Sequence, residues 1–322
     1  MSTVRILIGI AISLICGYFA VHGVEWGAVW AAFARMNMWS LIPALGFLTA
    51  MLALRAYRWQ RFVAPVQQVP VRPFWSATLI GFMANDILPL RAGEVVRAYA
   101  LAHLAPMRMS TALGTMVLER VWDAVAVAIL LAVTLAGFPL PQWLKRANVV
   151  LLGLCAVVLI GGWVITRRDD AWLSWLPPRL ATLVKHFVSG FAALRSVSLV
   201  FGAIFLSLLI WLMLVGYYWV LLHGCGFTLP LQAAFVVTIL TVFASAIPAA
   251  PGYLGTFQVA MVLALQFFAI PKEEALSFSL IAHLAQLLPI VSAGLIALTR
   301  ARLPLWPSQL GKAEPYSPSL SG

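Results

Sequence analysis

The sequence predicts an all-α polytopic membrane protein, with about six spanning helices and two re-entrant helical hairpins arranged as an inverted repeat. The first observation is composition: 63% of the 322 residues are apolar, 10% are charged, and the mean hydropathy is +0.98. A soluble domain carries roughly 25% charged residues, so most of this surface is expected to face hydrocarbon. The second observation is a set of apolar stretches of spanning length, and the third is a pair of apolar regions that are interrupted near their middles.

The expected spanning helices occupy residues 4–22, 37–56, 110–136, 148–166, 199–223 and 276–299. No small-residue cleavage site closes the first stretch, so we expect a retained helix there and not a removed signal. Cys16, Cys155 and Cys225 each lie in or at the end of an apolar run. They are expected to be small buried hydrophobic residues and not disulfide partners.

The two interrupted regions are residues 73–105 and 230–270. Pro89-Leu90-Arg91-Ala92-Gly93-Glu94 interrupts the first, and Pro248-Ala249-Ala250-Pro251-Gly252 interrupts the second. Proline removes a backbone donor and glycine frees the chain, so the helices should break at these points. Non-helical backbone at membrane depth is tolerated only where protein or a wet cavity satisfies its polar groups.

Basic residues orient this topology. They cluster in three connections and are Arg55, Arg58, Arg61 and Arg72; Arg167, Arg168, Arg179, Lys185 and Arg195; and Arg300 and Arg302. The positive-inside rule places all three connections in the cytoplasm, together with the N- and C-termini. They share one side only if each interrupted region enters and leaves through the same face.

The net charge of +11 also indicates the partner. Because the basic residues flank apolar spans, anionic lipid headgroups are a better partner than nucleic acid.

The order of elements repeats. Each half reads span, span, hairpin, span, from opposite faces, and the Pro-x-x-x-Gly stretches recur 159 residues apart (248 − 89 and 252 − 93). Inverted repeats with broken helices at their interface are typical of transporters. We expect a single transmembrane domain over residues 1–302, with halves at about 1–136 and 148–302, and a disordered tail over 303–322.

Charged residues inside the predicted membrane region are candidate functional residues, because each costs about 2.5–3.5 kcal/mol to insert. Those between positions 86 and 123 are Asp86, Arg91, Glu94, Arg97, Arg108, Glu119, Arg120 and Asp123. Glu119 and Asp123 are spaced i, i+4 and share one helix face, while Arg120 points about 100° away. Two interpretations stay open: a proton or headgroup relay facing a cavity, or an ion-pair network that fixes this helix to the hairpin.

Arg91, Glu94 and Arg97 surround the first break. Free backbone donors at a helix start favour an anion, and Arg adds a planar fork suited to phosphate. We therefore expect recognition of a phospholipid or polyprenyl-phosphate headgroup there. The alternative is that these Arg residues only neutralise the nearby carboxylates.

The second break carries no charge. Pro251, Gly252, Gly255 and Thr256 would offer backbone and hydroxyl contacts, and the nearest polar groups in apolar segments are Gln258, His283 and Gln286. A lone His on an apolar face is more often structural than catalytic, although it suits proton transfer. No Walker loop, dinucleotide fingerprint, metal-spaced Cys/His set or nucleophile elbow is present, so no cofactor or metal is expected, and a transporter is favoured over an intramembrane enzyme.

Three ordered motifs carry a resemblance. They are Asn85 to Arg97 (NDILPLRAGEVVR), Leu118 to Asp123 (LERVWD), and Pro251 to Gln258 (PGYLGTFQ). Over about residues 1–302 the chain resembles the flippase-like family built on the transmembrane region of lysylphosphatidylglycerol synthases. This resemblance implies lipid translocation, or association with it, in a bacterial inner membrane. Members of the family are linked to aminoacylated phospholipids, polyprenyl-linked sugars and hopanoids, so the resemblance does not specify the substrate. The family often has an acidic residue where this chain has Gln258, and the synthases append a soluble transferase domain that is not expected here.

The sequence therefore predicts a lipid flippase or lipid transporter. The predicted substrate-binding residues are Asn85, Asp86, Pro89, Arg91, Gly93, Glu94, Arg97, Glu119, Arg120, Asp123, Pro251, Gly252, Gly255, Thr256 and Gln258. Two alternatives remain. The protein could be an intramembrane enzyme that uses Glu119 and Asp123 as acid and base, or a scaffold for a lipid-synthesis enzyme.

Overall fold

A computed structural model describes residues 2–88, 92–137, 142–167, 175, 177–247 and 250–303. Within these ranges the chain is helical and contains no strand. The first half contains α1 (Ser2–Val21), α2 (Trp26–Ala34), α3 (Leu41–Val63), α4 (Val71–Ile87), α5 (Gly93–Leu104) and α6 (Met109–Gly137). The second half contains α7 (Gln142–Arg167), α8 (Pro178–Ser189), α9 (Val197–Gly224), α10 (Leu231–Ala246), α11 (Thr256–Gln266) and α12 (Lys272–Ala301). Short 3₁₀ turns are η1 (Met38–Ser40), η4 (Ala192–Arg195) and η5 (Pro251–Tyr253).

Four helical segments in the described ranges are long and apolar enough to cross a membrane: Met38–Val63, Leu144–Arg167, Val197–Gly224 and Lys272–Ala301. A fifth is reached if Ala11–Val21 and Trp26–Ala34, which meet at 84°, form one bent span. The protein is therefore a multi-pass membrane protein. The expected spans over 4–22 and 110–136 correspond to α1 and α6, which are helices of 20 and 29 residues outside that group of four.

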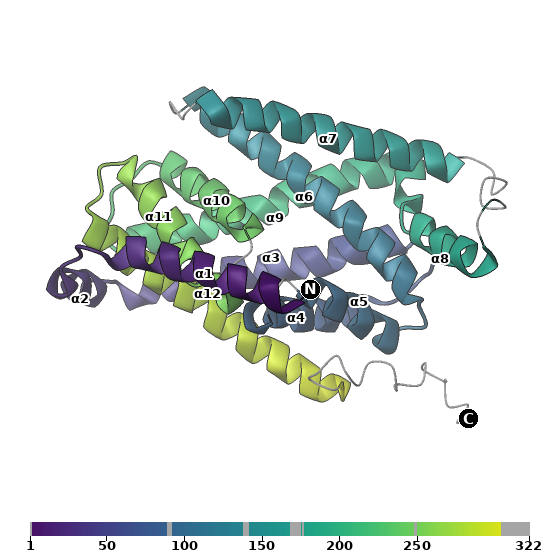
Figure 1. Cartoon of the computed structure of the whole chain (residues 1–322), viewed down its shortest axis with the longest axis horizontal. Coiled ribbons are helices and arrows are strands. Elements are labelled where there is room, and N and C mark those ends of the chain that lie inside the picture. The colour runs from purple at the N-terminus through teal and green to yellow at the C-terminus, as the bar shows by residue number, and fades with distance from the viewer. Residues whose placement is uncertain are drawn as a thin grey trace.

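The two interrupted regions each form a pair of short helices. In the first helix pair α4 packs on α5, and in the second helix pair α10 packs on α11. The pairs lie toward opposite ends of the molecule, and in each pair the first helix ends near the middle (Figure 1). Both pairs begin after a proline in extended backbone, Pro70 (φ −62°, ψ 160°) and Pro230 (φ −67°, ψ 159°). Proline suits this position, because a backbone N–H at the start of a helix has no intrahelical acceptor and the N–H that proline lacks is therefore not missed.

The breaks fall where the sequence places them. Helix α4 ends in extended backbone at Leu88, and α10 ends in extended backbone at Ile247. Pro89, Arg91 and Pro248 lie outside the described residues, as does the expected tail from residue 304 onward. Helix α5 begins at Gly93, which places Glu94 in its first turn.

The halves pack together through long helices. Helix α3 lies along α9 in the centre, α12 packs on α4, and α6 packs on α10 (Figure 1). Glycines allow two of these close approaches: a Cβ built on Gly216 would lie 2.6 Å from the Phe47 ring, and one on Gly294 would lie 2.8 Å from the Leu79 carbonyl oxygen. Helix α12 of the second half therefore covers α4, and α6 of the first half covers α10. The central helices α3 and α9 cover each other.

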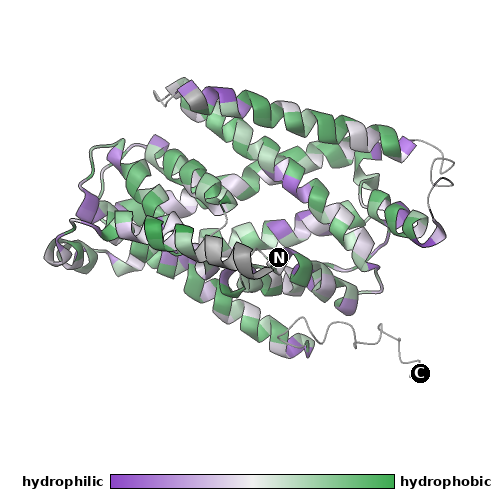
Figure 2. Ribbon diagram, viewed as in Figure 1, coloured by the Kyte–Doolittle hydropathy of each residue, from purple (hydrophilic) through white to green (hydrophobic). Residues whose placement is uncertain are grey.

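Hydrophobic residues predominate along the helices (Figure 2), and many of them are exposed. On α7, Leu154 and Val157 are 60% and 69% exposed, and on α9 Phe201 is 68% exposed. Exposed apolar surface on this scale indicates contact with lipid or another protein. The connections contain structure that the sequence analysis did not predict, namely α2 within residues 23–36 and α8 within residues 167–198.

Candidate functional site

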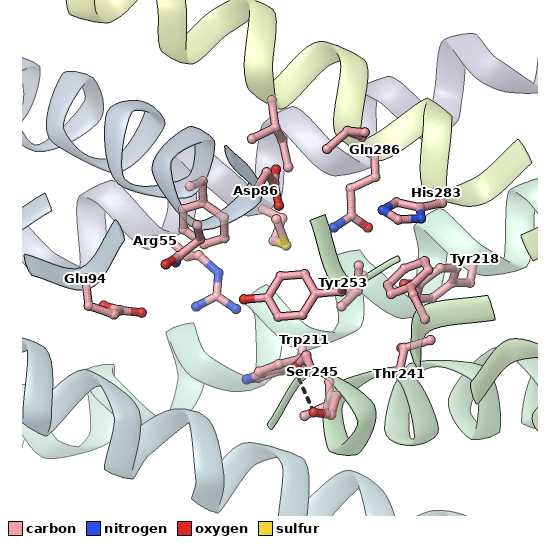
Figure 3. Close-up of a pocket in the computed structure, with 18 of the residues that line it drawn as sticks. Arg55, Asp86, Glu94, Trp211, Tyr218, Thr241, Ser245, Tyr253, His283 and Gln286 are labelled. Atoms are coloured by element: carbon pink, nitrogen blue, oxygen red, sulfur yellow. Dashed lines mark hydrogen bonds between the residues drawn. The ribbon is translucent and has the colours of Figure 1, made fainter. Parts of the chain in front are cut away.

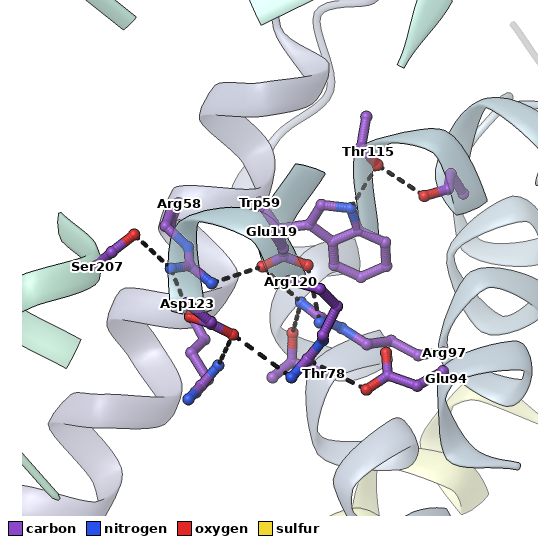
Figure 4. Close-up of polar contacts among 12 residues, drawn as sticks. Arg58, Trp59, Thr78, Glu94, Arg97, Thr115, Glu119, Arg120, Asp123 and Ser207 are labelled. Atoms are coloured by element: carbon purple, nitrogen blue, oxygen red, sulfur yellow. Dashed lines mark hydrogen bonds and ion pairs between the residues drawn. The ribbon is translucent and has the colours of Figure 1, made fainter. Parts of the chain in front are cut away.

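Two arginines that the sequence analysis placed in a cytoplasmic connection lie inside the protein. Helix α3 continues to Val63, so Arg55 and Arg58 belong to its last turns and are 4% and 0% exposed. The expectation that they are loop charges is wrong. Three residues apart, they lie on one face of α3, and Arg58 points toward Glu119 and Asp123 of α6 (Figure 4).

Arg58 joins both carboxylates of α6. Its Nη1 donates to Asp123 Oδ1 at 2.8 Å and to Ser207 Oγ at 2.6 Å, and its Nη2 donates to Glu119 Oε1 at 3.4 Å. The second oxygen of Asp123 accepts from Arg55 Nη1 at 3.0 Å. Because buried charges are tolerated when paired and hydrogen-bonded, this set ties α3, α6 and α9 together.

Arg97 connects α5 to the same set. Its Nη1 lies 2.9 Å from Glu119 Oε2, and its Nη2 donates to Thr78 Oγ1 at 3.2 Å. The guanidinium carbon lies 4.0 Å from the centroid of the Trp59 ring, which adds a cation–π contact. Arg97 and Glu119 are 2% and 1% exposed at their side chains, so this part of the network is dry.

Arg120 and Glu94 form the open edge of the network. Arg120 Nη2 lies 3.1 Å from Glu94 Oε1, and Arg120 Nη1 lies 3.4 Å from Asp123 Oδ2. Their side chains are 44% and 33% exposed. Asp123 Oδ2 therefore holds two guanidinium groups, one from the buried Arg55 and one from the accessible Arg120.

This edge opens into a cavity of about 160 Å³ between the two halves (Figure 3). Its charged wall comes from the first half and consists of Arg55, Asp86, Glu94 and Arg120. Its other wall comes mainly from the second half and is neutral; it includes Trp211, Tyr218, Thr241, Ser245, Tyr253, His283 and Gln286. The space suits several waters or one compact polar group, and a lipid chain would have to remain outside.

At this cavity the second break meets the end of α4. The 3₁₀ turn η5 packs on α4, and a Cβ built on Gly252 would lie 3.6 Å from the Asp86 carbonyl oxygen. Tyr253 has a left-handed φ of 56°, which is uncommon for a residue with a side chain. Its ring reaches into the cavity from the second break, toward Arg55 (Figure 3).

Hydrogen bonds fix the start of α11. Gln258 Oε1 accepts from the Gly255 backbone N–H at 2.8 Å, and Gln258 Nε2 lies 2.9 Å from His283 Nδ1. Thr256 Oγ1 donates to the Tyr253 carbonyl oxygen at 3.0 Å. Gly255 has φ 87°, and a Cβ there would lie 2.3 Å from the Ser13 carbonyl oxygen of α1. These contacts hold the second break against α1 and α12.

The predicted site residues separate into groups. Asn85, Asp86, Glu94 and Arg120 line the cavity, whereas Arg97, Glu119 and Asp123 lie in the buried network. Gly93 allows the close packing of the first helix pair, since a Cβ there would lie 2.1 Å from the Gly81 carbonyl oxygen. Pro251, Gly252, Gly255, Thr256 and Gln258 shape the second break and the start of α11. Pro89 and Arg91 lie outside the described residues.

Sequence reasoning missed Arg55, Arg58, Trp211, Tyr218 and Tyr253. A signal for the two arginines was available. They are spaced i, i+3 and so share one face of an apolar helix, and the two carboxylates of α6, spaced i, i+4, share one face of another and have the opposite charge. Tyr253 lies inside the third motif, Pro251 to Gln258. No such signal marks Trp211 and Tyr218, because their position depends on how the halves pack. Among the described residues, no group of three His, Cys, Asp or Glu side chains is arranged to hold a metal ion.

Comparison with known proteins agrees with this architecture. Residues 6–294 match the family model described as the lysylphosphatidylglycerol synthase TM region. The chain is also 26% identical over 280 residues to a UPF0104 membrane protein of Methanothermobacter thermautotrophicus, covering 81% of this chain and 83% of the relative. The matched region contains both helix pairs and every charged residue of the network.

Proposed function

Because the chain belongs to the family of the lysylphosphatidylglycerol synthase transmembrane region, we propose that it is a lipid flippase, which moves a lipid with an anionic headgroup between the leaflets of a bacterial inner membrane. The observation that carries this proposal is the central cavity, where the second break meets the end of α4 and two arginines share one carboxylate. The family is named after an enzyme that makes a membrane lipid. The cavity has charged side chains on one wall and a volume that suits a lipid headgroup, so it could bind a lipid of this class.

The proposed topology has six spans and two re-entrant helix pairs related as an inverted repeat. Its support is the matching order and length of the elements: α4 and α10 have 17 and 16 residues, α5 and α11 have 12 and 11, and α6 and α12 have 29 and 30. Sites of many transporters lie between such repeats, beside broken helices. The cavity between the two halves has this position.

One end of the molecule is basic, and we assign it to the cytoplasm with both termini. It is the end at which α3, α7 and α12 finish and α4, α6 and α9 start (Figure 1). The described basic residues there are Arg61, Arg72, Arg108, Arg167, Arg179, Lys185, Arg195, Arg300 and Arg302. The opposite end mixes both signs, with Arg35, Lys145, Arg146 and Lys272 beside Glu25, Glu273 and Glu274.

In this proposal Arg55 and Arg120 bind the anionic headgroup. Guanidinium groups pair with phosphate oxygens in a planar, bidentate manner, and Asp123 Oδ2 keeps both side chains at the cavity wall. The neutral wall would donate and accept hydrogen bonds with the rest of the headgroup. Arg97, Glu119 and Arg58 lie away from the cavity and would keep α3, α5 and α6 together.

The enzyme alternative is less well supported by the geometry. A general base must reach the proton that it removes, yet Glu119 is 1% exposed and lies against Arg58 and Arg97. Asp123 is surrounded by Arg55, Arg58 and Arg120. Two carboxylates that are neutralised in this way are suited to positioning helices and poorly suited to proton transfer.

Transport by the purified protein tests the proposal. In liposomes with a fluorescent phosphatidylglycerol, the wild type should exchange the lipid between leaflets faster than protein-free vesicles, and Arg120→Gln should lower this rate about tenfold. Arg120→Lys should retain part of it. Arg300→Gln, at an arginine outside the cavity, is the matched control, and thermal unfolding confirms folding of each variant. A wild-type rate equal to that of Arg120→Gln contradicts the proposal.

A further inference from the structure

A second polar pocket lies at the end of the molecule opposite α8, where α2 meets the start of α12 (Figure 1). It has a volume of about 320 Å³ and is lined by Arg35, Glu274, Ser277, Phe278 and the turn from Cys225 to Phe227. None of these residues lines the central cavity. Arg35 Nη2 lies 3.8 Å from Glu274 Oε1, and the two side chains are 67% and 35% exposed. Both charges are therefore available to a ligand.

Ser277 provides an independent indication of a ligand. The residue is 1% exposed, and its Oγ makes no hydrogen bond within the described structure. Its neighbour on α12, Ser279, bonds to the Leu276 carbonyl oxygen at 2.7 Å in the usual helical manner. Ser277 lines the pocket, and a buried hydroxyl without a partner costs free energy, so this residue is suited to binding a ligand oxygen.

An apolar groove of about 350 Å³ lies between α12, η1 and the start of α3. Its α12 wall is formed by Ile281, Leu284, Ala285 and Leu288. At helical spacing, Glu274, Ser277, Ile281, Ala285 and Leu288 follow one another along one face of α12. The distance from Ser277 to Leu288 along the axis is about 16 Å at 1.5 Å per residue. A polar pocket thus precedes an apolar groove, in the order of headgroup and acyl chain.

We propose that this pocket and groove form a second lipid site that binds one amine-bearing zwitterionic phospholipid. Arg35 and Ser277 bind the phosphate, Glu274 binds the ammonium group, and one acyl chain occupies the groove. The opposite signs of Arg35 and Glu274 match a headgroup that carries both charges, whereas an anionic lipid would leave Glu274 beside a phosphate. The inference is independent of the proposed transport through the central cavity.

Native mass spectrometry of the full-length protein in detergent tests this site with three added lipids that share the same chains. They are phosphatidylethanolamine, phosphatidylglycerol and diacylglycerol. Phosphatidylethanolamine should bind about tenfold more tightly than the other two. Glu274→Gln should reduce its preference over phosphatidylglycerol, and Ser277→Ala should weaken both phospholipids relative to diacylglycerol. Equal binding of the three lipids by the wild type, or tighter binding of phosphatidylglycerol, overturns the proposal.

Filling the groove separates this site from lipid bound elsewhere. Ala285→Phe should remove the high-affinity phosphatidylethanolamine, while Ala156→Phe, at an exposed position on α7, should not. Leu45→Trp fills the groove from the α3 side, where Leu45 is 45% exposed, and gives the same test if Ala285→Phe does not fold. Arg120→Gln, in the central cavity, should leave this binding unchanged. Wild-type affinity in both groove variants overturns the assignment.

Discussion

Arg58 Nη1 lies 2.8 Å from Asp123 Oδ1 in a part of the protein where the Arg58 side chain has no exposed surface. An ion pair of this kind contributes differently from one at a surface. Removing one partner leaves a buried charge without its counter-ion, so the loss exceeds the net contribution of the pair. The geometry therefore predicts large effects inside the network and small effects at its edge.

Arg58→Met should lower the free energy of unfolding by about 3–5 kcal/mol. The substitution keeps much of the side-chain volume and leaves Asp123, Glu119 and Ser207 each short of one donor. Unfolding in detergent micelles measures the loss. Arg61→Met, at an exposed arginine one turn further along α3, should change stability by about 0.5 kcal/mol or less. Equal losses in the two variants would contradict the buried network.

Arg97 and Glu119 should show strong energetic coupling. Arg97→Met and Glu119→Gln each unbalance the pair, and the double variant removes both charges together. Its loss should be smaller than the sum of the single losses by about 1–3 kcal/mol. A double-mutant cycle in micelles measures this coupling, and strict additivity would mean that the 2.9 Å contact carries no energy.

Gly93→Ala should force α4 and α5 apart. The new Cβ would lie 2.1 Å from the Gly81 carbonyl oxygen and 2.5 Å from Asn85 Oδ1, at a cost of about 1–3 kcal/mol. Gly153→Ala is the matched control, because a Cβ at that α7 position meets nothing within 4 Å. The control should unfold at the same temperature as the wild type or slightly above it. A Gly93→Ala protein of wild-type stability would refute the close packing.

Gln258→Leu should loosen the second break. It removes the acceptor of the Gly255 N–H and the partner of His283, with an expected loss of about 1–3 kcal/mol. Gln258→Glu supplies a carboxylate oxygen that can accept from the Gly255 N–H in place of the amide oxygen, so it should be the more stable of the two. Thermal unfolding ranks the variants. The reverse order would show that the hydrogen bond to Gly255 is not the main contribution of this side chain.

Cysteines placed at the basic end of the molecule and at the opposite end should be labelled from opposite sides of the membrane. In a variant without Cys16, Cys155 and Cys225, Arg179→Cys on α8 should be labelled by an impermeant maleimide only after cells are opened. Glu25→Cys, in the connection before α2, should be labelled in intact cells. Both residues are exposed in the structure. The opposite labelling pattern would reverse the orientation, and labelling of both from one side would refute the topology.

Local signals predicted much of the fold. Proline and glycine marked both breaks, so the expected interrupted regions 73–105 and 230–270 agree closely with the helix pairs at 71–104 and 231–266. The i, i+4 spacing predicted that Glu119 and Asp123 share a face, and both carboxylates do contact Arg58. These features depend on neighbouring residues, which is why one sequence suffices to find them.

Contacts between distant segments were harder to predict. A hydropathy window ends the second helix at its first arginine, so Arg55 and Arg58 were assigned to a connection. Their burial depends on carboxylates 61 to 68 residues away, and a local window does not contain them. The neutral wall with Trp211 and Tyr218 likewise depends on α9 packing along α3. Helix α8 was missed because its 12 residues are too short to resemble a span.

The charged network has a further consequence for the order in which the chain is made. Among the described residues, the ionised groups of this network lie between Arg55 and Asp123, and the contributions from later in the chain come from α9, as the Ser207 hydroxyl and the Trp211 ring beside Arg55. The ribosome therefore delivers α3 and α5 before α6 enters the membrane. When Glu119 and Asp123 of α6 enter the membrane, the arginines of α3 and α5 are already present to pair with them. The first half can therefore neutralise its charges while the second half is still being translated.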